Sequence, residues 1–167
     1  MTSSSPDFLK IVRQKSIVTD KQEYIETINY LVEEQPVLAS LLFDLDDEMS
    51  EEMQEYLYQA VVMLVQGFRE TGIHVRLIPE ESVKNIISEK DELYKEAVDE
   101  ENPIFDKEKL LSLSHNPSVL ELLYDTYFDK VSSDPDAYNV YDRLNLLFML
   151  DVIISVIEEN TDIRQEL

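Results

Sequence analysis

The sequence predicts an all-α fold, a single-domain bundle of about seven or eight helices. Apolar residues recur three and four positions apart in each long segment, which is the period of a helix. Only residues 73–78 (IHVRLI) are typical of a strand, and because one strand cannot form a sheet we expect an extended connector there. The chain of 167 residues is also long enough for one complete hydrophobic core.

The N-terminal region is expected to contribute little to the core. Residues 1–7 are polar and predicted to be disordered, so the domain begins at residue 8 and continues to residue 167. Residues 8–18 are apolar and hold the chain's basic cluster, Lys10, Arg13 and Lys15. We expect a first helix that lies against the acidic body, with a membrane or partner arm as the alternative.

Capping residues and proline divide the first half of the chain into three further helices. A helix that starts at Thr19 ends before Pro36, because proline disfavours helical geometry at the residue before it. Pro36 itself suits a first helical position and starts a short helix over residues 36–45. Ser50 then caps a long helix that continues to about Thr71.

The second half follows the same logic. Pro79 begins a helix that continues to about Val98, and Asp106 starts a shorter one. Residues 117–131 form another short helix. Asp134 as cap, followed by proline, begins a last long helix to about residue 160.

Two segments of the chain align without gaps, QPVLASLLFD at 35–44 and NPSVLELLYD at 116–125. Each is preceded by a helix and followed by an acidic joint and a long apolar helix. We therefore expect two related helical units, over residues 20–71 and 106–160. The alternative is that proline-started amphipathic helices simply look alike.

The composition is strongly acidic. Fourteen Lys and Arg stand against thirty-six Asp and Glu, which gives a formal net charge of −22. Such a surface repels phosphate backbones and anionic membranes, so we expect no nucleic acid and no membrane as a partner. Two glycines are too few for a phosphate-wrapping loop, and the chain has no cysteine. No segment resembles a secretion signal, and the sequence predicts a cytoplasmic protein.

Residues 56–68 and 144–157 are apolar on almost all sides. Such helices are enclosed by other helices or by a second subunit, so we expect them at the centre of the bundle. A homodimer through their apolar faces is predicted if the other helices leave them uncovered. Asp151 interrupts the second segment and shares a stripe with Ser155 and Glu158. We expect this stripe to face solvent, with an inward-facing pair or a metal ligand as the alternative.

The acidic stretch over residues 44–55 has the spacing of a calcium-binding loop. Oxygen-bearing side chains stand at the six ligand positions of a twelve-residue loop: Asp44, Asp46, Glu48, Ser50, Glu52 and Glu55. However, Met49 stands where such a loop needs glycine for its sharp turn, and Ser50 is also a natural helix cap. We interpret the stretch as an acidic joint between helices, with a divalent-cation site as the alternative.

Tyrosine and aspartate alternate between residues 124 and 142. Tyrosine offers a large contact area and a hydrogen bond, and the neighbouring carboxylates suit a basic partner. If the two predicted units lie side by side, their acidic joints meet at one end of the bundle. The predicted partner-binding surface consists of Asp46, Asp47, Glu48, Tyr127, Asp129, Asp134, Asp136 and Tyr138. The alternative is that half of the rings in this region belong to the core.

We assign no catalytic residue, no cofactor and no metal site. His74 and His115 lie at element boundaries, and neither has a second histidine at ligand spacing. The sequence therefore predicts a non-enzymatic helical interaction protein, an adaptor or an immunity-type inhibitor, that binds a basic protein partner. Two alternatives stay open: a divalent-cation protein that uses the 44–55 loop and, more weakly, a metal-dependent hydrolase.

Overall fold

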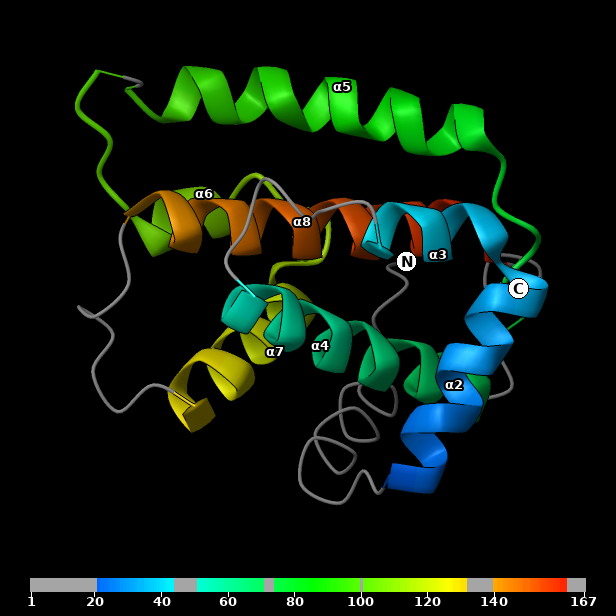
Figure 1. Ribbon diagram of the computed structural model, residues 1–167. Helices are drawn as coiled ribbons and strands as arrows, with labels where there is room; N and C mark the ends of the chain where they lie inside the picture. The colour runs from blue at the N-terminus through cyan, green and yellow to red at the C-terminus, as the bar shows by residue number, and fades with distance from the viewer. Residues whose placement is uncertain (1–20, 44–50, 71–73, 100, 132–139, 162–167) are drawn as a thin grey trace.

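The computed structural model describes residues 21–43, 51–70, 74–99, 101–131 and 140–161 (Figure 1). In these ranges the chain forms seven α-helices, and the only extended pairing is one antiparallel bridge between Val75 and Thr161. The helices are α2 (Lys21–Glu34), α3 (Pro36–Phe43), α4 (Glu51–Glu70), α5 (Glu80–Ala97), α6 (Lys107–Leu111), α7 (Pro117–Val131) and α8 (Val140–Glu159). The predicted all-α fold is confirmed.

The helix boundaries follow the local signals of the sequence. α2 ends one residue before the Gln35–Pro36 step, and Pro36 is the first residue of α3. Pro79 occupies the N-cap position of α5 in an extended conformation. Asp106 caps α6, because its carboxylate accepts a hydrogen bond of 3.2 Å from the backbone N–H of Lys109.

Several predicted features fall outside the described residues. They are the disordered tail over 1–7, the segment at 8–18, the loop positions 44–50 and the Asp134 cap of the last helix. Within the described residues, no helix is both long and apolar enough to cross a membrane.

α4 and α8 form the centre of the fold, as predicted. α8 packs against α4, α5 and α7, and the side chains of both central helices are buried over most of their length. In α8 this burial includes all residues from Met149 to Ile157. Most of the apolar surface that motivated a homodimer is thus covered within one chain, although Leu144 and Phe148 are only half-buried. The homodimer itself stays a prediction.

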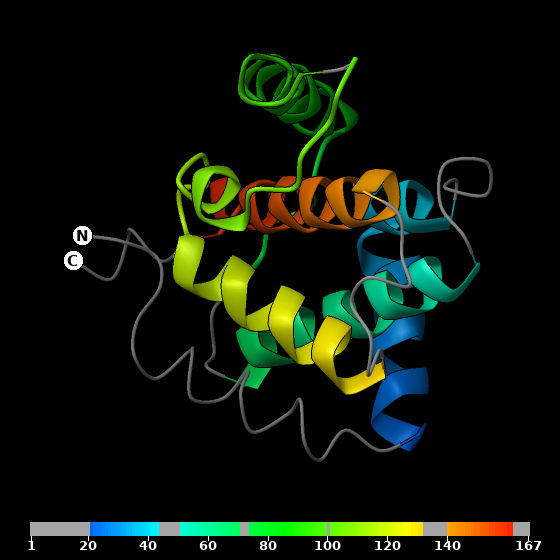
Figure 2. The ribbon, with the colours of Figure 1, turned by 90° about the vertical axis from the view of Figure 1, so that its left-hand side faces the viewer.

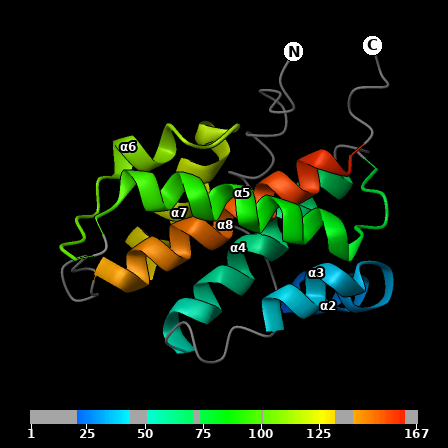
Figure 3. The same ribbon diagram turned by 90° about the horizontal axis from the view of Figure 1, so that it is seen from above.

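The helices are arranged in layers around α8. α5 lies on one side of α8 as an outer layer, and α4 and α7 lie on the other side (Figure 2). Seen from above, α5 crosses over α8, and α3 lies beside the N-terminal half of α5 (Figure 3). α3 is held in place through α2, which packs against both α3 and α4.

The connector before α5 is extended, as expected, and is held by a buried glutamine. The Nε2 atom of Gln35 donates hydrogen bonds to the carbonyl oxygens of Val75 (3.3 Å) and Arg76 (3.0 Å). Its Oε1 atom accepts one from the backbone N–H of Ile78 at 3.0 Å. Because an extended segment has no helical bonds of its own, this amide replaces partners that its backbone would otherwise lack.

The aligned segments share one structural feature. Gln35 and Asn116 each precede the first proline of a helix, are buried, and bond through their side chains to distant parts of the chain. The helices that follow differ in length, however, with 8 residues in α3 and 15 in α7. The equivalence is therefore local, and the two-unit repeat stays a prediction.

Candidate functional site

A groove with a volume of about 1180 Å³ lies between α3, α5 and α8. We call it the α5 groove, because α5 lines it from its first residue to the residue after its last. Its apolar lining includes Leu41 of α3, Ile87 and Tyr94 of α5, and Leu144 and Phe148 of α8. The groove is thus a largely apolar trough between three helices, a common setting for ligand sites.

Each helix contributes one face to the groove and another to the core. In α3, Val37 and Leu41 are four positions apart and line the groove, whereas Leu38 and Leu42 point into the core and are buried. In α8, Leu144 and Phe148 have the same spacing and are half-buried. α3 and α8 thus have apolar residues on two faces. One face packs into the core, and the other is available for a second contact at the groove.

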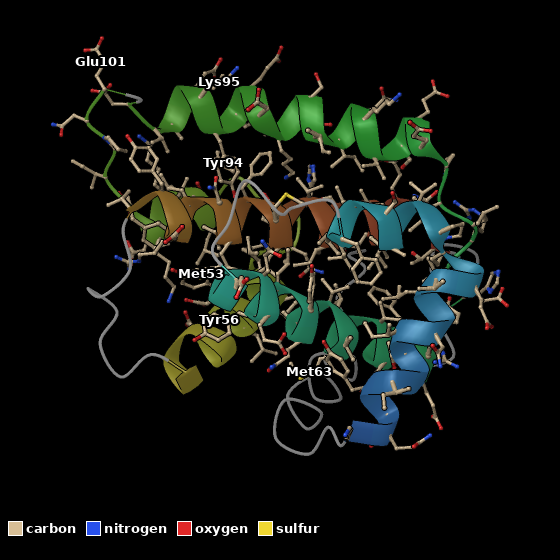
Figure 4. The ribbon with its side chains drawn as sticks, viewed as in Figure 1. Met53, Tyr56, Met63, Tyr94, Lys95 and Glu101 are labelled. Atoms are coloured by element: carbon tan, nitrogen blue, oxygen red, sulfur yellow. The ribbon has the colours of Figure 1, made fainter. Side chains whose placement is uncertain are left out.

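Tyr94 connects the groove to the interior. Its ring lines the groove and meets the ring of Phe148 edge to face, with centroids 5.0 Å apart. Figure 4 shows Tyr94 reaching from α5 towards α8, where its hydroxyl donates a hydrogen bond of 3.3 Å to Oδ2 of Asp151. Burial, and then the adjacent Asp151 carboxylate, raise the pKa of Tyr94 far above its usual value. The phenol therefore keeps its proton and stays a donor.

Beneath Tyr94 lies a buried ion pair. Nζ of Lys90 is 3.3 Å from Oδ2 of Asp151 and 3.1 Å from the carbonyl oxygen of Leu113, to which it donates a hydrogen bond. The other carboxylate oxygen, Oδ1, is buried without a hydrogen-bond partner among the described residues.

The expected solvent-facing stripe on α8 is therefore wrong. Asp151 and Ser155 are buried and Glu158 is largely enclosed, because α5 covers this side of α8. The alternative of an inward-facing pair is the one observed, with Lys90 as the partner. A carboxylate in the interior requires such a partner, because burying a lone charge is very costly in free energy.

A second polar cluster lies near the C-terminal end of α8. Oε2 of Glu158 accepts a hydrogen bond of 3.0 Å from the side-chain amide of Asn116, and burial raises the pKa of Glu158. Ser82 of α5 donates to Oε1 of Glu159 at 3.1 Å and accepts from Nδ2 of Asn160 at 3.0 Å. These bonds attach the first turn of α5 to the end of α8.

The charged groups at and below the groove are paired with one another. Neither Lys90 nor Asp151 lines it, and the two groups are engaged with each other. The charged side chains on its α5 wall form exposed pairs within the helix, Glu80 with Lys84 (3.1 Å) and Asp91 with Lys95 (3.0 Å). Among the described residues, no group of three or more His, Asp or Glu side chains is arranged to hold a metal ion. The arrangement offers apolar contact area with a charged rim.

Most of the predicted partner-binding residues lie outside the part of the chain that the structure describes. These are Asp46, Asp47, Glu48, Asp134, Asp136 and Tyr138. Tyr127 and Asp129 lie in α7, but the description does not extend to their side chains. The surface formed by these residues therefore stays a prediction.

The described tyrosines of the same region have different environments. Tyr124 is buried and its ring stacks on that of Phe105 with centroids 5.6 Å apart, as the core interpretation expects. Tyr141 is 58% exposed and lines the α5 groove. The predicted acidic, tyrosine-bearing region thus reaches the groove at Tyr141.

The sequence interpretation did not identify the groove or the ion pair. The apolar periodicity of the 79–98 helix places Val83, Ile87 and Tyr94 on one side, but it does not show whether neighbouring helices cover that side completely. A signal was present, because Lys90 stands on the same stripe, four positions after Ile86 and four before Tyr94. A lysine in an apolar stripe predicts a buried partner, and Asp151 is the corresponding carboxylate in the last helix.

The chain was also compared with known proteins. No family model, no curated protein and no solved structure matches it.

Proposed function

We propose that this protein is a non-enzymatic helical interaction protein, and that it binds an apolar segment of a protein partner in the α5 groove. The observation that carries the proposal is the groove itself, whose apolar lining comes from three helices and is left half-buried at Leu41, Ile87, Leu144 and Phe148. Apolar surface gathered in one concave place is typical of binding sites.

Two features support a basic protein as the partner. The net charge of −22 attracts basic molecules over a long range and speeds their encounter. Tyr141 at the rim offers an aromatic contact of the kind that is enriched in protein interfaces. An adaptor or an inhibitor of a basic protein fits this description, and the lack of cysteine fits the cytoplasm as its proposed location.

A photo-crosslinking experiment in the source cell tests the proposal. p-Benzoylphenylalanine replaces Lys84 at the rim of the groove and, as a control, Asn29 on the exposed face of α2. We expect a defined protein to be crosslinked from position 84 and not from position 29. The same product from both positions would contradict a site in the groove.

A matched pair of variants makes the test specific. Leu41→Glu places a charge in the apolar lining, whereas Val32→Glu places the same charge on a 52% exposed position of α2 outside the groove. We expect Leu41→Glu to lose the crosslink at position 84 and Val32→Glu to keep it, with helicity and melting temperature measured for both. Retention of the crosslink by a folded Leu41→Glu protein would overturn the proposal.

A further inference from the structure

The α5 wall of the groove has an internal repeat of eleven residues. The residues of α5 and its C-cap that line the groove fall into two sets of four, Glu80, Val83, Lys84, Ile87 and then Asp91, Tyr94, Lys95, Val98. Each set reads acidic, apolar, lysine, apolar, and each member of the second set lies eleven positions after its counterpart. The acidic-to-lysine ion pair recurs as well, at 3.1 Å in the first set and 3.0 Å in the second.

This spacing keeps both sets on one face of α5. Eleven residues make three turns with an angular drift of only about 20°, and they advance about 16 Å along the axis. The wall therefore repeats the same charged and apolar pattern twice along the helix. In each set the first apolar residue, Val83 or Tyr94, is buried at the base of the groove, and the second, Ile87 or Val98, is half-buried. The whole stripe from Glu80 to Val98 is about 27 Å long at 1.5 Å per residue.

An α-helix is the kind of partner segment that fits along this repeating wall of α5. When two helices pack along their length, residues that occupy equivalent positions recur with the same period on both. The groove also has helices on its other sides, α3 and α8, with apolar residues four positions apart. A long trough between helices, with one wall of helical period, is the geometry of helix-in-groove recognition.

We propose that the α5 groove binds an amphipathic α-helix of a partner protein, with an apolar stripe of eleven-residue period and basic residues at the same period. This inference rests on the proposed function and names the chemistry of its partner. The basic residues of the partner helix meet Glu80 and Asp91, which repeat at the matching distance. The exposed pairs of these carboxylates with Lys84 and Lys95 are weak, so a partner's lysine or arginine can share them.

The net charge of the protein favours a partner helix of positive charge. The rim alone is balanced, because each carboxylate has a lysine four positions away. The rest of the molecule brings the net charge to −22, and this field favours a basic helix over an acidic one of the same pattern.

Designed peptides test the inference with the full-length protein. The first peptide has about 22 residues, with leucine at alternating spacings of four and seven and lysine at an eleven-residue period. The second has the same composition with its leucines and lysines at a seven-residue period. Affinity is measured by fluorescence anisotropy at two salt concentrations, and helix formation on binding by circular dichroism.

We expect the eleven-residue peptide to bind at least about tenfold more tightly than its isomer and to become helical, because only the first keeps both sets in register. Leu41→Glu is expected to remove this binding, and Val32→Glu to leave it unchanged. Equal affinity of the two peptides, binding without helix formation, or binding by neither peptide would overturn the inference.

The rim charges provide variants that are safe for folding, because all four side chains are more than half exposed. We expect Lys84→Glu with Lys95→Glu to tighten binding of the basic peptide by about three- to tenfold at low salt, and Glu80→Lys with Asp91→Lys to weaken it similarly. No change in either double variant would overturn the assigned contacts.

The outcomes separate the inference from the proposed function. If the crosslink at position 84 is lost in Leu41→Glu but the two peptides bind equally, the groove is a binding site and the helical partner is wrong. If Leu41→Glu changes neither the crosslink nor peptide binding, the groove itself is not the site and both proposals fail.

Discussion

Nζ of Lys90 on α5 lies 3.3 Å from Oδ2 of Asp151 on α8, and the two side chains are only 1% and 0% exposed. Taking two charges out of water costs several kcal/mol for each ion, and their attraction must offset this cost. The hydroxyl of Tyr94 and the carbonyl oxygen of Leu113 complete the surroundings of the pair. This network fixes the position of α5 over α8 and hence the shape of the groove between them.

Breaking this ion pair should destabilise the protein strongly. We expect Lys90→Met to lower the free energy of unfolding by about 3–5 kcal/mol, because it leaves the Asp151 charge buried without its partner. Chemical denaturation followed by circular dichroism measures the change. Lys84→Met is the control, since its exposed pair with Glu80 contributes about 0.5 kcal/mol or less.

Removing the whole network should cost less than breaking it. In the triple variant Lys90→Met, Tyr94→Phe and Asp151→Leu no buried charge or hydroxyl is left unpaired in this network. We expect this protein to be more stable than Lys90→Met alone, because an apolar set of similar volume avoids the cost of desolvation. A triple variant less stable than Lys90→Met would contradict this expectation.

Glu158 should make stability depend on pH. Its pKa in the folded protein is raised above 4.5, chiefly by burial, so the folded state binds the proton more strongly than the unfolded state does. This group therefore lowers stability as the pH rises from about 4.5 through its folded pKa. We expect Glu158→Gln to be more stable than the native chain at neutral pH, with the difference vanishing below pH 4.5. Denaturation midpoints from pH 4 to pH 8 measure it, and a difference independent of pH would contradict the assignment.

Gln35 should be needed for the connector before α5. Gln35→Met keeps the side-chain volume but leaves the N–H of Ile78 and two carbonyl groups without this partner. We expect a loss of about 1–3 kcal/mol in the free energy of unfolding and faster hydrogen exchange at the Ile78 amide. Gln22→Met on the exposed surface of α2, where the side chain bonds to Glu26, is the matched control and should have little effect.

Arg76 should stabilise the end of α8. Its guanidinium donates hydrogen bonds to the carbonyl oxygens of Glu159 (3.2 Å) and Thr161 (3.4 Å), at the negative end of the helix dipole. We expect Arg76→Gln to cost about 0.3–1 kcal/mol, because it removes the charge. Exchange rates of the amides in the last turn of α8 should rise, whereas those in the middle of the helix should not. Uniform rates along α8 would count against this role.

The helices could be predicted because their signals are local. Proline at positions 36, 79 and 117 and the Asp106 cap act within one turn of the chain, and each stands at an observed helix boundary. The central position of α4 and α8 could be predicted for a similar reason. A helix that is apolar on nearly all sides has to be enclosed, whatever the order of the elements.

The candidate site could not be predicted in the same way. Whether Val37, Ile87 and Leu144 were covered or left half-exposed depended on how far α3, α5 and α8 stood from one another. Apolar spacing identifies a face that is buried by something, but it does not identify the neighbour or the gap that remains. The partner of Asp151 could not be predicted either, because Lys90 belongs to a different helix and the spacing within one helix does not identify its neighbour.

The sequence by itself determined the helical class, the boundaries at Pro36, Pro79, Asp106 and Pro117, the enclosed pair α4 and α8, and the net charge. These follow from local backbone preferences, apolar periodicity and composition. The eleven-residue repeat of α5 is also present in the sequence, but the sequence does not show which surface the repeat faces. The tertiary structure alone decided that Asp151 meets Lys90 and that the repeat faces a groove. Both depend on the crossing of α5 over α8, which is set by packing between segments far apart in the chain.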